Sequence, residues 1–313
     1  MNARFLSLRR AFAAALVLAA AASAQRGGPQ PEYARQAQQS IRQGKLDEAL
    51  DIYRKELATN PNSQDANRGA GLVLDLMGKG AEARPYYQKA IDAAPDAARK
   101  AAAERDMAMS YAFSGDCRNT VKFEQMVFDY WVTVPDFYQQ GEMANEAARV
   151  CIDAGDLDTA EKYYKIGHDA GLKEPDIAPG RKDLWAFRWE HAAARLAARR
   201  GQKAEAQKHV DAAKAALDDM ATKDEGLATQ QRGFFPYLTG YVAYYAGDYP
   251  KALAELQKAN QSDPFFQCLI GMTYEKLGDK DKAMEAYKKA SVTTAHNPPA
   301  AFARPFARKK LGL

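Results

Sequence analysis

Apolar residues recur along the chain at helical spacing, in blocks that are separated by glycine turns. Six stretches share one arrangement: a glycine, an alanine five residues later, and a large side chain four positions beyond that alanine. A seventh, weaker stretch has Thr120 in place of the alanine. Because apolar positions spaced in this way mark amphipathic helices, the pattern predicts about seven helix pairs. The turn glycines are Gly44, Gly78, Gly115, Gly155, Gly201, Gly247 and Gly278.

Each position of this pattern has a physical role. A glycine at the turn supplies the left-handed backbone that ends the first helix of a pair. Small residues let two helix axes approach closely, and Gly71, Gly240 and Gly271 recur seven residues before a turn glycine. The large residue of the second helix, for example Tyr87 or Tyr287, fills the resulting space. One pair leaves an apolar face uncovered, so neighbouring pairs are expected to stack.

The pattern resembles the tetratricopeptide repeat, a helix–turn–helix unit of about 34 residues. The resemblance implies an all-α fold, a right-handed α-solenoid of about seven hairpins over residues 32–297. Longer spacings between residues 125 and 235 leave room for an extra turn or a longer pair. Residues 298–313 are expected to form a C-terminal capping helix, with Phe302 and Phe306 facing the stack and the basic residues facing water.

The N-terminal segment has the three-part layout of a secretory signal. Arg4, Arg9 and Arg10 precede an apolar run over residues 11–22, and Ala22-Ser23-Ala24 offers a cleavage point. The run is shorter than the roughly 20 residues that span a bilayer, which favours cleavage over a membrane anchor. We therefore expect residues 1–24 to be a cleavable signal peptide, residues 25–31 a flexible lead-in, and the mature chain periplasmic or secreted.

Charge and motifs exclude several functional classes. The 44 basic and 40 acidic residues give a net charge of +4, too balanced for a nucleic-acid-binding chain to be the first expectation. The four histidines are dispersed, and the chain has no phosphate-binding loop, no nucleophile elbow and no zinc motif. The sequence therefore predicts no enzyme, no cofactor and no metal site.

In solenoids of this type the first helix of each pair, the A helix, lines the concave face. The residues expected there carry arginine through the middle of the array and tyrosine toward its C-terminal end. Arginine holds carboxylates with two bonds, and tyrosine offers a rigid ring with a polar tip, so an acidic peptide would suit this lining. The alternative is that these side chains pair with acidic neighbours or pack between helices. The residues are Arg68, Arg105, Asn145, Arg149, Arg188, His191, Arg195, Tyr237, Tyr241 and Tyr244.

Two cysteines are placed to meet in this architecture. Cys117 begins the second helix of one pair and Cys151 lies late in the first helix of the next, and such helices pack antiparallel. We expect a disulfide between them; the alternative is two small buried thiols. Cys268 would remain a free, buried thiol.

These observations favour an exported scaffold that binds a protein or peptide partner, acidic in character if the arginines are free. The alternative is a module that binds a small molecule or a glycan on aromatic rings. That module would use Tyr237, Tyr241 and Tyr244 together with Trp185 and Trp189, unless the tryptophans only fill the space left by the long repeats.

Overall fold

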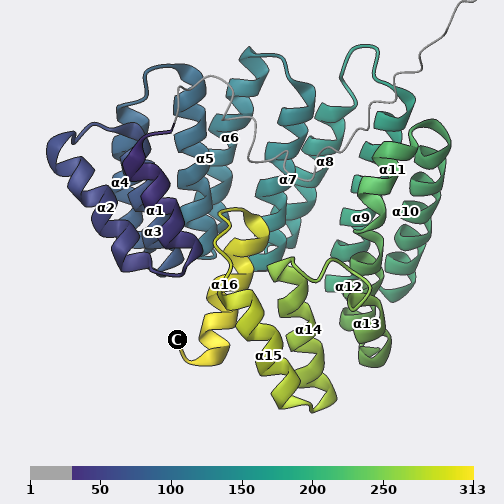
Figure 1. The fold of residues 1–313 in the computed structure, drawn as a ribbon. Coiled ribbons are helices and arrows are strands. Elements are labelled where there is room, and N and C mark those ends of the chain that lie inside the picture. Colours follow the sequence, from purple (N-terminus) through teal and green to yellow (C-terminus); the bar gives the residue numbers. More distant parts are fainter. Residues whose placement is uncertain (1–29) are drawn as a thin grey trace, which may run out of the picture.

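The computed structural model describes residues 30–313, and all regular structure within them is helical (Figure 1). The predicted signal peptide, residues 1–24, and most of the lead-in lie outside the described residues. No helix in the described part combines the length and the apolar character needed to cross a bilayer.

Fourteen of the sixteen described helices form seven antiparallel pairs, each an A helix followed by a B helix. Neighbouring pairs pack against one another in chain order, so the described chain is an all-α solenoid (Figure 1). The pairs are α1 (Glu32–Arg42) with α2 (Leu46–Thr59), α3 (Gln64–Leu76) with α4 (Gly80–Asp92), α5 (Ala97–Phe113) with α6 (Cys117–Thr133), α7 (Phe137–Ala154) with α8 (Leu157–Gly171), α9 (Pro179–Arg199) with α10 (Lys203–Lys223), α12 (Phe235–Ala246) with α13 (Tyr249–Leu256), and α14 (Pro264–Leu277) with α15 (Lys280–Ser291).

The turn glycines end the A helices as expected. All seven have a positive φ, between 68° at Gly115 and 91° at Gly155, in the region that residues with a side chain rarely adopt. Four of the B helices that follow, and the A helices α5, α7 and α14, begin behind an aspartate whose carboxylate accepts a backbone N–H; Asp156 and Asp279 are examples. The repeated glycine therefore sets the position of each hairpin turn.

Close approach within a pair depends on small residues in the A helix. A Cβ added at Gly71 would lie 2.6 Å from the ring of Tyr87, and one at Gly271 would lie 2.5 Å from the ring of Tyr287. Leu256 takes the same position against Gly240, at 2.7 Å. The large residue of the B helix fills the space over the glycine, which confirms this part of the sequence prediction.

The middle of the array is enlarged in two ways. Helices α9 and α10 each have 21 residues, and a short helix, α11 (Glu225–Arg232), lies between α10 and α12. Trp185 of α9 is buried between Gly141 and Gly171, either of which would clash with it if it carried a Cβ. Trp185 is therefore a packing residue that occupies the extra space in the long repeats.

The C-terminal end of the chain folds back onto the early repeats. After α15 the chain enters α16 (Pro298–Leu311), which packs on α14 and α15 and also on α5 and α7 (Figure 1). Phe302 packs on Phe265 and Phe306 on Tyr287, as expected of a capping helix. We call residues 293–313 the C-terminal clasp.

Two polar contacts tie the clasp to α3. His296 Nε2 lies 2.9 Å from Asp75 Oδ2, and Arg304 Nε donates a 2.7 Å hydrogen bond to the carbonyl of Leu76. Arg304 is buried, so the expectation that all basic residues of the last helix face water is wrong for this one. Its guanidinium is instead bonded to main-chain carbonyls at the end of α3 and at the end of α15.

Candidate partner-binding site

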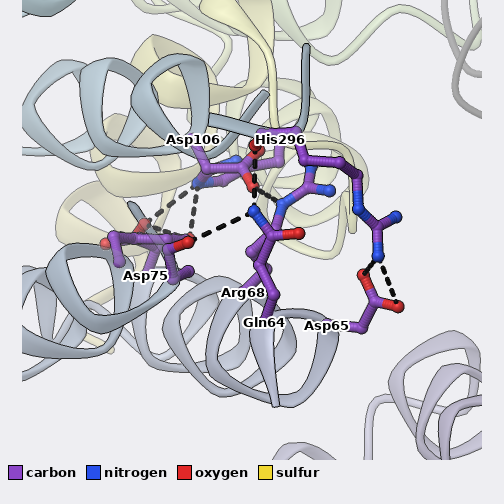
Figure 2. Close-up of polar contacts among 9 residues, drawn as sticks. Gln64, Asp65, Arg68, Asp75, Asp106 and His296 are labelled. Carbon is purple, nitrogen blue, oxygen red and sulfur yellow. Dashed lines mark hydrogen bonds and ion pairs between the residues drawn. The ribbon is translucent and has the colours of Figure 1, made fainter. Parts of the chain in front are cut away.

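Partly exposed ion pairs link neighbouring A helices along the array. Arg68 of α3 lies 2.5 Å from Asp106 of α5 (Figure 2), and Arg105 of α5 makes two hydrogen bonds, 2.8 and 2.5 Å long, to Glu146 of α7. Arg188 of α9 bonds to Glu142 of α7 and, at 3.1 Å, to the hydroxyl of Tyr138. We call these six residues the A-helix charge row: Arg68, Asp106, Arg105, Glu146, Glu142 and Arg188.

The row is electrically balanced, because each arginine has one acidic partner. The paired carboxylates raise the pKa of Arg68 and Arg105 above the usual value, Asp106 acting on the first and Glu146 on the second. The side chains of the row remain 18–32% exposed. Three arginines of the predicted concave face are thus on the surface, but paired with acidic neighbours.

A buried carboxyl group lies behind the row. Glu124 of α6 is 1% exposed, and burial together with the neighbouring Glu146 raises its pKa well above the usual value. This environment favours the neutral form of the Glu124 carboxyl group, because a charged form would be buried beside the charge of Glu146.

Five other predicted groove residues lie in the interior. Arg195, His191, Tyr237 and Tyr241 are at most 9% exposed, and the side chain of Arg149 is 16% exposed. Helices α12 and α14 contribute the residues that cover them. The expectation of an open concave face is wrong for these residues. Tyr237 of α12, the next A helix, lies on Arg195, and Phe265 of the more distant α14 lies on Arg149.

The buried arginines are stabilised by rings and hydroxyls. Arg195 donates to the hydroxyls of Tyr164, at 2.8 Å, and Tyr237, at 3.3 Å. The guanidinium of Arg149 lies 4.1 Å from the centroid of the Phe265 ring, a cation–π contact. Burial and these two cations lower the pKa of His191 well below its usual value, so His191 is neutral.

The remaining predicted residues take local roles. The side chain of Asn145 lies against Gly167 of α8, and Tyr244 is half-buried among Tyr245 and Tyr249. Burial raises the pKa of Tyr244 to about 12. With Tyr237, Tyr241 and Trp185 buried, the tyrosines and tryptophan do not form the open aromatic surface that the glycan-binding alternative requires.

The cysteines lie as the repeat geometry predicts. Cys117 at the start of α6 and Cys151 of α7 form a disulfide with a Cα–Cα distance of 4.8 Å, closing a separation of 34 residues. Cys268 is buried and unbonded to another cysteine, and burial raises the pKa of its thiol.

One buried cluster of polar side chains, centred on Asp75, was not expected from the sequence. Asp75 is 2% exposed and its carboxylate accepts hydrogen bonds from Ser110, at 2.8 Å, and Tyr87, at 3.0 Å, besides the contact with His296 (Figure 2). The available signal was a lone aspartate in the apolar run Leu72-Val73-Leu74-Asp75-Leu76 of an A helix, since a charged residue at such a position needs a buried partner.

The described residues contain no cluster of three or more histidine, cysteine, aspartate or glutamate side chains placed to hold a metal ion. Repeat folds of this type are generally non-catalytic.

Comparisons with known proteins agree with the repeat architecture. Two stretches, residues 34–98 and 266–291, match models of the tetratricopeptide repeat family. No protein in a set of curated proteins matches.

Solved structures with a similar fold have low sequence identity. The apo form of RapI is 9% identical, covers 90% of this chain and 97% of its own, and superposes with a TM-score of 0.53. A tetratricopeptide repeat protein from Parabacteroides merdae is 14% identical, covers 83% of this chain and 91% of its own, with a TM-score of 0.49. A Rap protein complexed with Competence and Sporulation Factor is 12% identical, covers 82% of this chain and 72% of its own, with a TM-score of 0.48.

The glycine turns, the glycine–tyrosine contacts within the pairs and the two family matches lead to one conclusion: the chain contains tetratricopeptide repeats.

Proposed function

We propose that the chain is an exported, non-catalytic scaffold that binds a protein partner through the A-helix charge row, in the periplasm or outside the cell. The observation that carries the proposal is the row itself, in which charged side chains that are 18–32% exposed run across four successive A helices. A repeat fold of this type suggests a protein–protein interaction scaffold, and the row is the surface through which a long segment of a partner would contact several repeats at once.

Two observations support export. The first is the sequence of residues 1–24, with arginines, a short apolar run and small residues at the cleavage point. The second is the disulfide between Cys117 and Cys151, because such bonds persist in oxidising compartments and are rare in the cytosol.

The balance of the row bears on the class of partner. Each arginine already has a carboxylate, so the row offers charges of both signs. A partner that presents both acidic and basic side chains would exchange pairs with it at little electrostatic cost. The earlier expectation of an acidic peptide relied on unpaired arginines and gains no support from these three pairs.

A charge-swap variant tests the row directly. Arg68→Asp combined with Asp106→Arg keeps an ion pair between α3 and α5 but inverts the charges that a partner meets. Purified wild-type and swapped chains would be crosslinked in an envelope extract, and the captured proteins quantified. We expect the swapped chain to lose at least tenfold of the captured partner while its thermal unfolding stays within a few degrees.

The matched control swaps an ion pair outside the row. Lys310 and Glu275 lie 2.8 Å apart and their side chains are 37% and 35% exposed, so Lys310→Glu with Glu275→Lys makes the same kind of change. This control should capture as much partner as wild type. Equal capture by all three chains, or no stoichiometric partner at all, would contradict the proposal.

A further inference from the structure

A cavity of about 530 Å³ lies where the C-terminal clasp meets the second and third hairpins. Its walls come from the end of α3, the start of α4, the turn after α5 and one side of α16. The charged side chains of the lining on the α16 side are all basic: Arg304, Arg308 and Lys309. A cavity of this size is typical of sites that hold a small molecule.

The basic residues of this cavity have no acidic partner within residues 30–313. No carboxylate lies within 4 Å of Arg304, Arg308 or Lys309, whereas Lys310, the next residue, is paired with Glu275. Arg304 is 6% exposed, and its hydrogen bonds go to the carbonyls of Leu76, Ser291 and Thr293. These carbonyls hold the guanidinium in place but leave its positive charge uncompensated.

Like charges therefore lie close together in a partly dry space. Burial, together with the nearby cation of Arg308, lowers the pKa of Arg304 to about 10. A negatively charged ligand would relieve this unfavourable interaction, since buried charges are normally paired.

The opposite wall contains the start of a helix. Helix α4 begins at Gly80, which lines the cavity, and its N-cap residue Lys79 makes no side-chain hydrogen bond to the first turn. Free backbone N–H groups at the start of a helix attract anions. Glu82 in the same turn is an exposed acidic residue that does not line the cavity.

Asp75 is the acidic residue of the lining, and its carboxylate is already engaged. Its Oδ1 atom accepts from Ser110, and its Oδ2 atom is bonded to Tyr87 and His296. The carboxylate also lies near the start of α4, with Oδ1 3.5 Å from the position that a Cβ of Gly80 would take. Its single negative charge is outnumbered by the three basic side chains of α16 in the same lining.

We propose that this cavity binds a small multivalent oxyanion, with carboxylate or phosphate groups held by Arg304, Arg308 and Lys309 on one side and the start of α4 on the other. Arginine pairs bidentately with both groups. The site is separate from the A-helix charge row, and its occupant bridges α16 and α4. Binding therefore stabilises the docked position of the C-terminal clasp.

Calorimetric titration of the purified chain tests the site with three probes: inorganic phosphate, citrate and a hexaglutamate peptide. We expect citrate or phosphate to bind in the titration. In a separate thermal scan, the probe that binds should raise the unfolding temperature. Arg308→Ala combined with Lys309→Ala should weaken binding at least tenfold, and neither side chain makes a described ion pair that folding would lose. Lys310→Ala, on the same helix, should bind as wild type does.

A separate variant addresses the buried arginine. Arg304→Lys keeps the positive charge but loses the guanidinium that bonds to three carbonyls. Weakened binding together with unchanged amide hydrogen exchange in α16 would assign Arg304 a direct contact with the anion, whereas faster exchange would assign it to docking of the clasp. The proposal is overturned if no probe binds at millimolar concentration, or if Lys310→Ala loses as much affinity as the double variant, which would indicate an adventitious ion only. Binding of the peptide alone would overturn the small-molecule assignment.

Discussion

Reduction of the disulfide between Cys117 and Cys151 is expected to lower the free energy of unfolding substantially. In the loop-entropy treatment, a crosslink that closes 34 residues stabilises a protein by about 4 kcal/mol. The folded state itself should change little, because Cys117 is 7% and Cys151 0% exposed and both pack in an apolar cluster with Ala148, Ile152 and Ala160. The effect arises mainly in the unfolded chain, which gains freedom.

Urea unfolding followed by circular dichroism, with and without a reductant, measures this difference in free energy. A thermal scan of the same samples measures the unfolding temperature. About 4 kcal/mol corresponds to a fall of roughly 8 °C in the unfolding temperature of a chain of this size, at about 2 °C per kcal/mol. The double variant Cys117→Ala with Cys151→Ala should resemble the reduced wild type and should not respond to the reductant. Cys268→Ala should keep the full response.

Thiol alkylation under denaturing conditions gives the independent check. One cysteine, Cys268, should react before reduction and three afterwards. Three reactive cysteines in unreduced chain isolated from its native compartment, or superimposable unfolding curves with and without reductant, would refute the reasoning and remove one support for export.

Three further changes probe packing, closure and charge. Gly271→Ala should destabilise the fold by about 1 kcal/mol, because a Cβ 2.5 Å from the buried ring of Tyr287 costs about 1–3 kcal/mol and the gain in helix propensity returns only about 1; chemical unfolding measures this. His296→Ala removes one of the three partners of the buried Asp75, so amide hydrogen exchange in α16 should speed up, as expected when a charge-assisted bond of about 1.5–3 kcal/mol is lost. Glu124→Gln should raise the free energy of unfolding at pH 7. The pKa of Glu124 in the folded state lies above 4.5, so the wild type loses stability as the pH rises from 4.5 toward that pKa. The amide of glutamine does not titrate and removes this loss.

Each of these changes has an outcome that would contradict it, and the glycine change also has a control variant. Gly226→Ala, in α11, has its nearest neighbour at 3.4 Å and should stabilise by about 0.5–1 kcal/mol; if Gly271→Ala also stabilises, the close contact has been misread. Faster exchange of α2 to the same degree as α16 would contradict a local effect of His296. An equal pH dependence of stability in wild type and in Glu124→Gln would show that Glu124 is not the group that titrates.

The hairpins and the disulfide could be predicted because they depend on local spacing. A glycine that must adopt a positive φ, such as Gly155, and a tyrosine that must fill the space over another glycine leave marks at fixed distances in the sequence. Once those marks place the helices, the neighbouring positions of Cys117 and Cys151 follow.

The fate of the predicted concave face could not be read in the same way. The sequence spacing placed Arg149 and Arg195 on the inner side of their helices, which is where they lie. It did not show that Tyr237 of the next A helix would cover Arg195, or that Phe265, more than two hairpins further on, would cover Arg149. The contact of Asp75 with His296 spans 221 residues and depends on the accumulated curvature of the whole array, which no local pattern encodes.

The C-terminal clasp has a consequence for how such a chain can change in length. An open solenoid tolerates the gain or loss of a unit in its middle, because the ends do not need to meet. Here the last helix must arrive at the end of α3 with Arg304 within reach of the Leu76 carbonyl, and that arrival depends on the number and tilt of every hairpin between them. Deleting one internal hairpin would move α16 away from α3 and break the contact between Arg304 and Leu76. The number of hairpins between these two helices is therefore fixed by the geometry of the closure.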